Sequence, residues 1–286
     1  MDGIVIVDKP RDWTSQDVTA RLRRVFGTRR IGHGGTLDPM ATGVLPVFVG
    51  RATRGVEFFE HAEKTYETVL RLGLTTDTED ITGTVLTEVP VSVTDEQVEG
   101  ALESFRGEIM QVPPMYSALK VNGQKLCDLA RKGKTVERQP RPITIYELQL
   151  LDRGENTLRL RVRCSKGTYI RTLCKDIGET LGCGGCMESL RRVSAGEYTI
   201  AEAVPLQELL DTVEPETYLR GVDTMFCNYP AVTLTANQEK RCRNGNTFSV
   251  KLPEGTYRAY SQSGEFLMLA KVEAGVMTTI KSFFAV

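Results

Sequence analysis

Residues 32–46 read GHGGTLDPMATGVLP and contain four glycines, two prolines, a single acid and one of the two histidines in the chain. Glycine lets a backbone adopt a positive φ or approach another segment closely. Asp38 is steered away from the α region because a proline follows it. The apolar run 44–49 comes next and is typical of a buried strand. We therefore predict a rigid loop that presents one carboxylate beside a core strand, whereas composition alone would make Asp38 a turn residue.

This loop resembles the catalytic motif of the TruB family, the bacterial tRNA pseudouridine-55 synthases, which is Gly-His-x-Gly-x-Leu-Asp-Pro-x-Ala-Thr-Gly-x-Leu-Pro. The similarity covers nearly the whole chain and is firmest over residues 3–195. Further matching segments follow in the family's order at residues 7–10, 14–15, 64–66, 76–80, 114–120, 165–171 and 190–192. One departure is Asp12-Trp13, because the family usually has a glycine near position 12.

The resemblance implies an α+β fold with a mixed, mainly antiparallel sheet core flanked by helices, which is the pseudouridine synthase fold. It also implies a small C-terminal PUA-like β-barrel domain. We place the catalytic domain at residues 1–225 and the PUA-like RNA-binding domain at residues 229–286. Within the first, residues 107–142 correspond to the family's thumb-like insertion, and their many charges and glycines favour mobility.

Periodicity predicts the main elements. Short apolar or alternating runs predict strands, at residues 4–7, 44–49, 64–74, 143–151, 157–164, 190–193 and 198–200. Apolar residues at helical spacing behind a capping Thr, Ser or Asp predict helices, at residues 15–26 and 94–105, and residues 169–181 also read as a helix. Residues 75–83 read as a solvated acidic turn, and residues 107–142 as irregular and basic with a short helix within 123–132.

Length and composition place the protein among soluble globular chains of about two domains. No run of 18 apolar residues is present, so no membrane span is expected. The first residues lack the features of a signal peptide. Seven cysteines, an odd number, indicate a reducing compartment, and we expect a cytoplasmic protein. Cys183 and Cys186 have the spacing of half a zinc site, but no second pair matches it, so we interpret them as free thiols.

Charge is segregated along the chain although the net charge is only −1. Residues 19–36 carry five arginines and no acid, residues 158–175 carry six basic residues and no acid, and residues 119–142 carry seven against two. The compensating acids lie in 76–108 and 201–223. This distribution suits one face that binds phosphates, although solvated amphipathic faces produce the same pattern.

The implied reaction breaks the N1–C1′ glycosidic bond of a uridine, turns the uracil and joins C5 to C1′, and it needs no cofactor and no metal. Asp38 matches the family's catalytic carboxylate, which serves as nucleophile or proton shuttle. Whether it attacks C6 of the base, adds to C1′ or takes a ribose proton is open at this stage. Arg171 matches the arginine that pairs with it, and such a cation would hold the carboxylate ionised and oriented.

The other site residues are also assigned by resemblance. A target base inside a folded RNA loop must be flipped out, and Tyr66 matches the aromatic residue that stacks on it, with its hydroxyl as candidate base for the C5 proton. Tyr169 and Leu190 match residues that line the uracil pocket. For all three, plain core packing is the alternative.

Three further residues complete the predicted substrate contacts. His33 matches the residue that fills the gap left in the RNA stack, and Lys64 and Arg24 are placed among the substrate-binding residues. A metal role for His33 is disfavoured, because the only other histidine is His61 and no ligand spacing links them.

The sequence thus predicts an isomerase that converts uridine 55 in the T-loop of tRNA, acting as a monomer with the tRNA T-arm as its partner. The alternative is a non-catalytic tRNA-binding or tRNA-folding protein, which would need the basic face but not Asp38, Tyr66 and Arg171 together. Phosphotransfer through an aspartyl intermediate is disfavoured, because Met40 stands where such sites place a second acid.

Overall fold

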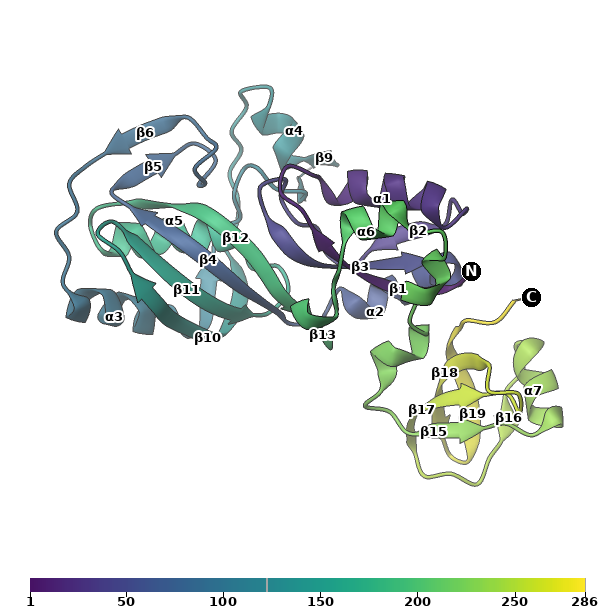
Figure 1. The fold of residues 1–286 in the computed structure, drawn as a ribbon. Coiled ribbons are helices and arrows are strands. Elements are labelled where there is room, and N and C mark those ends of the chain that lie inside the picture. Colours follow the sequence, from purple (N-terminus) through teal and green to yellow (C-terminus); the bar gives the residue numbers. More distant parts are fainter. Residues whose placement is uncertain (122, 286) are drawn as a thin grey trace.

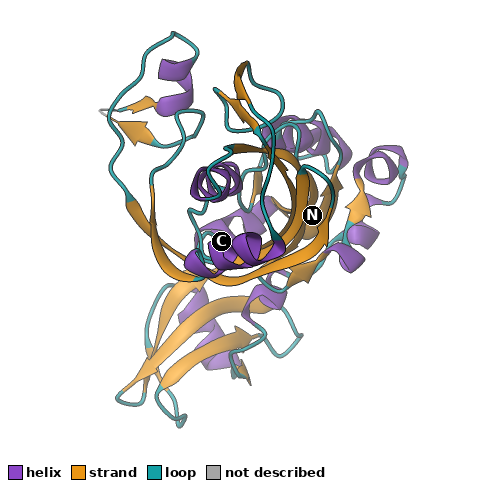
Figure 2. Ribbon diagram, turned by 90° about the vertical axis from the view of Figure 1, so that its left-hand side faces the viewer, coloured by secondary structure: helices purple, strands orange, loops and turns teal. Residues whose placement is uncertain are grey.

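The computed structural model describes residues 1–121 and 123–285, and its main feature is one curved ten-stranded sheet (Figures 1 and 2). Eight strands lie in the order β14-β1-β3-β12-β4-β11-β10-β7, with β2 added beside β3 and β13 beside β12. The bounds are β1 Gly3–Lys9, β2 Ile31–His33, β3 Thr42–Val49, β4 Lys64–Leu72, β7 Gly107–Gln111, β10 Arg141–Arg153, β11 Thr157–Cys164, β12 Gly185–Ala195, β13 Tyr198–Thr199 and β14 Val204–Pro205. Only the β1–β14 and β3–β12 pairings are parallel, which confirms the predicted mixed, mainly antiparallel sheet.

Four helices pack on one face of this sheet, and Figure 2 shows the sheet curving around helices, whereas the short helix Val56–Phe59 packs through Phe59 with Ile4, Ile6 and Phe48 on the other face. Apolar side chains of α1, α3, α5 and α6 share one buried cluster with the strands. The helices are α1 Ser15–Val25, α2 Val56–Phe59, α3 Asp95–Ser104, α4 Leu126–Ala130, α5 Ile170–Thr180 and α6 Leu206–Asp211, with 3₁₀ turns at Gly50–Gly55, Ile200–Glu202, Pro215–Tyr218 and Val222–Phe226. None of the helices described is long and apolar enough to cross a membrane.

The start of α1 shows how sequence sets an element here. The Thr14 side chain accepts a hydrogen bond from the backbone N–H of Asp17, and the Asp17 carboxylate accepts one from the backbone N–H of Thr14. This capping box satisfies two amides that the helix itself cannot pair. Val18 and Leu22, one turn apart, are completely buried. The predicted helix is therefore confirmed together with its cap.

Two small hairpins stand at one end of the large sheet (Figure 1). One consists of β5, Leu74–Thr76, and β6, Val85–Glu88; the other consists of β8, Lys120–Val121, and β9, Gln124–Lys125, and leads into α4. The prediction that residues 107–111 are irregular was wrong. They form β7, which pairs antiparallel with β10, and Ile109 lies opposite Ile143. The neighbouring prolines and charges gave this segment the pattern of a loop, but its backbone amides and carbonyls form hydrogen bonds with the long strand β10.

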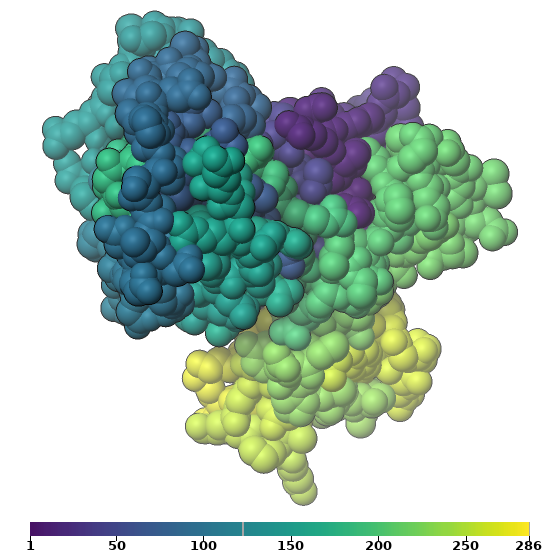
Figure 3. Space-filling model, turned by 60° about the vertical axis from the view of Figure 1, so that its left-hand side comes forward, coloured from purple at the N-terminus to yellow at the C-terminus, as the bar shows by residue number. Residues whose placement is uncertain are grey.

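The C-terminal residues form a separate five-stranded sheet in the order β15-β17-β18-β19-β16. Its elements are β15 Ala231–Thr233, α7 Ala236–Arg243, β16 Phe248–Ser249, β17 Gly255–Tyr260, β18 Phe266–Glu273 and β19 Val276–Ser282. They enclose an apolar core of their own and appear as a distinct lobe in Figure 3. Phe226, Leu269 and Phe283 form a small cluster that joins the lobe to the rest. The exact boundary between 225 and 229 and the PUA-like character stay predictions.

Candidate active site

The loop before β3 is fixed on both sides of Asp38. The buried Ser15 hydroxyl donates to the carbonyl of Leu37 at 3.2 Å and accepts from its amide at 2.9 Å. On the other side, the amide of Asp12 donates to the carbonyl of Pro39 at 2.8 Å. Both partners come from the β1–α1 segment. The predicted rigid loop beside a core strand is thus present, and it holds Asp38 between two anchored neighbours.

Two glycines of the loop are required by close packing. Gly43 has φ of 100°, and a Cβ there would lie 2.2 Å from the carbonyl oxygen of Arg192. A Cβ on Gly34 would lie 2.4 Å from the ring of Phe59. Only glycine fits such positions without displacing its neighbours. These two glycines of the loop therefore allow it to pack closely against β12 and α2.

Asp38 and Arg171 form the predicted ion pair. The Arg171 Nε atom lies 2.8 Å from Asp38 Oδ2, and Nη2 lies 3.4 Å from Oδ1. The Arg171 side chain is 6% exposed, whereas that of Asp38 is 35% exposed. Two-point contact of this kind fixes the plane of the carboxylate. The acid is therefore oriented from the protein side and remains open on the other side.

Arg171 also connects Asp38 to the two hairpin segments. Its Nη2 donates to the carbonyl of Tyr116 at 2.8 Å, and its Nη1 donates to the carbonyl of Thr78 at 3.2 Å. Tyr116 lies in the 112–140 segment and Thr78 in the β5–β6 connection. The first turn of α5 thereby brings both segments to the loop that carries Asp38.

Asp80 is a site residue that sequence reasoning missed. Asp80 is 6% exposed, and its Oδ2 lies 3.9 Å from Arg171 Nε, so two carboxylates face the same nitrogen of Arg171. Asp80 Oδ1 accepts hydrogen bonds from the Thr82 amide and hydroxyl and from the Thr78 hydroxyl. The interpretation of 75–83 as a solvated turn was wrong for this residue, because local threonines and a distant arginine satisfy it. Its place in the matching segment 76–80 was the available signal.

Tyr66 and Leu190 lie on neighbouring strands, β4 and β12, and share the buried cluster with Leu37 and Met40 of the Asp38 loop. Their exposures are 9% and 8%. Burial raises the pKa of the Tyr66 hydroxyl, and the nearby Arg192 guanidinium opposes this rise. The hydroxyl is thus protonated near neutral pH. The structure brings both predicted residues to the Asp38 loop.

Arg192 is a second missed residue, and it is completely buried at 1% exposure. Its Nε donates to the carbonyl of Val44 at 2.7 Å, and its Nη2 donates to that of Gly35 at 3.1 Å. Among the residues the structure describes, no carboxylate lies within 4 Å of it. A cation with no carboxylate beside it keeps its positive field for the surroundings, which include Tyr66.

Two of the other predicted contacts, Lys64 and His33, lie near Arg192, whereas Tyr169 lies at the start of α5. Lys64 is 8% exposed, and burial together with Arg192 lowers its pKa to about 8. His33 is half-buried on β2, and burial and Arg192 lower its pKa as well. Within the described chain, the Nδ1 atom of His33 is buried without a hydrogen-bond partner. Tyr169 precedes α5, and the side chain of buried Gln111 bonds both its amide and its carbonyl.

Arg24 is exposed on α1 and makes no contact with these residues, so the structure places it at the surface. The five arginines of residues 19–36 have no carboxylate within 4 Å in the described parts of the chain. On β11, by contrast, Arg159, Arg161 and Arg163 pair with glutamates that lie in β4 or β10 or directly before β4. The basic run in 158–175 therefore does not form one free cationic face, because cross-strand acids that are distant in sequence balance it.

Metal ligands do not gather in the described residues: no group of three or more His, Cys, Asp or Glu side chains has suitable spacing there. All seven cysteines are free thiols. The site thus offers one oriented carboxylate, that of Asp38. Tyr66 and Leu190 form a wall beside it, and the buried Arg192 cation contacts the loop from behind.

Comparison with known proteins agrees with these observations. The family model described as TruB family pseudouridylate synthase (N terminal domain) matches residues 23–170, and that described as tRNA pseudouridylate synthase B C-terminal domain matches residues 171–222. The chain is 47% identical to the tRNA pseudouridine synthase B of Ralstonia pickettii, over 87% of this chain and 80% of that protein. It is 42% identical to the Clostridium kluyveri protein of the same name, over 93% and 94%.

Solved structures share the fold at lower identity. A chain of a Cbf5–Nop10–Gar1 complex is similar with a TM-score of 0.75 and 24% identity, over 99% of this chain and 85% of that one. A chain of an H/ACA ribonucleoprotein bound to a substrate RNA containing 2′-deoxyuridine is similar with a TM-score of 0.74 and 22% identity, over the same shares.

Proposed function

The chain belongs to the TruB family and is a tRNA pseudouridine synthase, and we propose that it isomerises uridine 55 in the T-loop of tRNA with Asp38 as the essential carboxylate. The observation that carries this assignment is the two-point contact between Asp38 and Arg171, which leaves the outer side of the carboxylate open. A protein that only binds or folds tRNA would not need this arrangement.

The reaction conserves every atom of the uridine, so the protein has to supply only positioning, charge and proton movement. The N1–C1′ bond breaks, the uracil turns and C5 joins C1′, after which the C5 proton leaves and N1 is protonated. Asp38 acts as nucleophile or proton shuttle at the freed ribose or base. Holding the carboxylate in one plane removes orientational freedom before the reaction starts.

Tyr66 and Leu190 supply the walls for the flipped base. Stacking of a base on an aromatic ring contributes about 1–3 kcal/mol, which offsets the few kcal/mol of unstacking in the RNA. Because burial raises the pKa of Tyr66, its ring is better suited to stacking than its hydroxyl is to taking the C5 proton. Tyr169 borders the site from the start of α5.

The test is to incubate the protein with unmodified tRNA transcripts in the presence of a chelator and to map pseudouridine by position. One modified uridine at position 55 supports the proposal, and a transcript with cytidine at that position should stay unmodified. Conversion of a different uridine would refute the assigned position. Binding without any conversion would favour the alternative of a tRNA-binding protein.

A further inference from the structure

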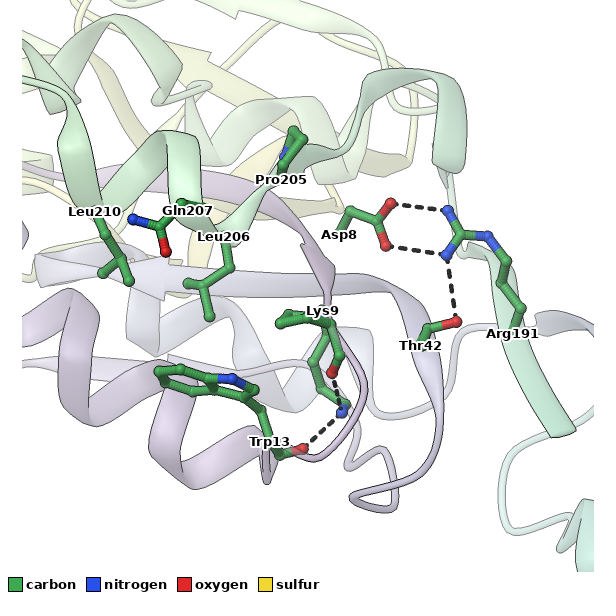
Figure 4. Close-up of a pocket in the computed structure, with 10 residues that line it drawn as sticks. Asp8, Lys9, Trp13, Thr42, Arg191, Pro205, Leu206, Gln207 and Leu210 are labelled. Atoms are coloured by element: carbon green, nitrogen blue, oxygen red, sulfur yellow. Dashed lines mark hydrogen bonds and ion pairs between the residues drawn. The ribbon is translucent and has the colours of Figure 1, made fainter.

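A cavity of about 410 Å³ lies behind the catalytic loop and is not used by the reaction described above (Figure 4). It opens between the end of β1, the turn before α1 and the start of α6. We propose that this cavity binds a second nucleobase, either an unpaired base of the RNA substrate or that of a free nucleotide. The RNA form of the proposal rests on the proposed function.

The walls suit a flat ring. The indole of Trp13 forms one side, and Leu206 and Leu210 of α6 lie close to it (Figure 4). Cavities that bind small planar ligands are mostly apolar and hold about 300–1,000 Å³. An aromatic wall recognises any base by stacking. The size and shape of this cavity therefore admit one base and leave little room for a folded peptide.

One end of the cavity is polar and carries both donors and acceptors. Arg191 donates to the Asp8 carboxylate at 2.8 and 3.2 Å and to the Thr42 hydroxyl at 3.2 Å. The side chains of Arg191 and Asp8 are still 42% and 26% exposed. Carboxylate and guanidinium groups keep free acceptor and donor positions in such a pair. The edge of a nucleobase presents the matching mixture of donors and acceptors.

The surroundings favour a ligand that carries phosphate. The Arg21 guanidinium lies over the Trp13 ring at 5.9 Å from its centroid. Arg21 and its α1 neighbours Arg23 and Arg24 have no carboxylate within 4 Å in the described residues. Cations next to a stacking ring are the usual combination in sites for single-stranded nucleic acid.

The cavity is also connected to the reaction site. The Nζ atom of Lys9, whose residue lines the cavity, donates to the carbonyl of Pro39, the residue after Asp38. Thr42, on the opposite wall, is four residues after Asp38. When the uridine of an RNA lies at Asp38, the neighbouring nucleotides of that RNA are therefore close enough to the cavity for one of their bases to enter it.

The experiment uses Trp13 as a probe, because it is the only tryptophan in the chain. Its fluorescence is measured in Asp38→Asn protein while T-arm RNA or each nucleoside monophosphate is added. We expect saturable quenching by the RNA, by a free nucleotide, or by both, and the effective ligand identifies the source. Omitting single bases from the RNA loop then identifies the base that enters. Absence of quenching by every ligand overturns the proposal.

A cavity-filling variant supplies the control. Gln207 is exposed and lines the cavity, whereas the adjacent exposed Glu208 does not. Gln207→Phe should lower the affinity for the ligand that quenches Trp13 about tenfold, which corresponds to about 1.4 kcal/mol. Glu208→Phe should bind this ligand as tightly as the parent protein does. Equal affinities of the two variants overturn the proposal. Because turnover is not read here, an inactive wild-type enzyme would refute the proposed function without deciding the cavity.

Discussion

Asp38 is restrained through its backbone and its side chain by separate parts of the chain. The backbone is held at Leu37 and Pro39, and the carboxylate is held by Arg171. Rigid placement of a reacting group is among the largest contributions that a protein can make to a rate. The position of Arg171 is therefore also important, and Asp80 is the second carboxylate that lies near it.

Asp80 lies 3.9 Å from the same Arg171 Nε atom that contacts Asp38, so its removal should disturb turnover more than binding. We expect Asp80→Asn, which keeps the volume, to lower kcat about tenfold or more with little change in KM, a loss of about 1.4 kcal/mol per factor of ten. Steady-state kinetics on tRNA measure this, with the exposed Glu88→Gln as control. A kcat equal to that of the control would show that Asp80 has no part in positioning.

Asp12 has φ of 67°, a conformation that side chains with a branched Cβ adopt with strain. Its own side chain is 85% exposed, so substitution there changes little packing. We expect Asp12→Val to be less stable than Asp12→Gly by about 1–2 kcal/mol, measured by urea unfolding. Equal free energies of unfolding would mean that the turn relaxes in solution.

Lys9 makes stability depend on pH. Its side chain is fully buried, and burial lowers its pKa from 10.5 to about 8. Between these values the unfolded chain keeps the proton and the folded chain releases it, so the free energy of unfolding rises with pH.

Comparison with Lys9→Met isolates this effect from other titrating groups. The stability of wild type relative to Lys9→Met should increase by about 1–2 kcal/mol between pH 7.5 and 9.5, as read by urea unfolding at each pH. A difference that stays constant, or falls, across this range would contradict the lowered pKa.

At the level of elements, α1 and β11 show that a similar run of arginines can serve two purposes. On β11 the arginines are balanced by glutamates in or next to neighbouring strands, whereas no carboxylate of the described residues lies within 4 Å of the α1 arginines. Only the second arrangement can displace counterions from RNA phosphates.

We therefore expect Arg21→Gln combined with Arg24→Gln to weaken tRNA binding and to reduce the slope of log K against log salt by about 0.7–0.9 per lost phosphate contact. Filter binding at several salt concentrations measures both quantities. Arg159→Gln with Arg163→Gln is the matched control and should leave the slope unchanged. If the β11 variant reduced the slope and the α1 variant left it unchanged, the RNA-binding face would lie on the outer side of β11 instead of on α1.

Most elements could be predicted from local pattern, because periodicity and caps report local structure directly. Thr14 at the start of α1 and the buried run 44–49 are examples. The edge strand β7 could not be predicted from its own residues, because its pairing partner β10 begins about 30 residues later. Local sequence carries no record of such a partner.

At the level of the whole molecule, the active site is assembled by the order of strands in the sheet. β12 lies between β3 and β4, so Arg192 pairs in register with both Gly43 and Tyr66. Asp38, Tyr66 and Arg171 could be proposed from the sequence through family resemblance. Asp80 and Arg192 lie in matching segments of the sequence, but their contacts with Arg171 and with the Asp38 loop join residues far apart in the chain and become visible only in the folded structure.

The role of the Asp38 carboxylate is tested most directly by single-turnover pseudouridine formation by Asp38→Asn with saturating enzyme, measured beside the tRNA affinity of the same variant. Asparagine keeps the shape of the side chain and removes its charge. We predict affinity close to that of wild type and a rate lower by at least about a thousandfold, or about 4 kcal/mol in the barrier. A variant that binds normally and converts tRNA within about tenfold of the wild-type rate would contradict the central role of the Asp38 carboxylate.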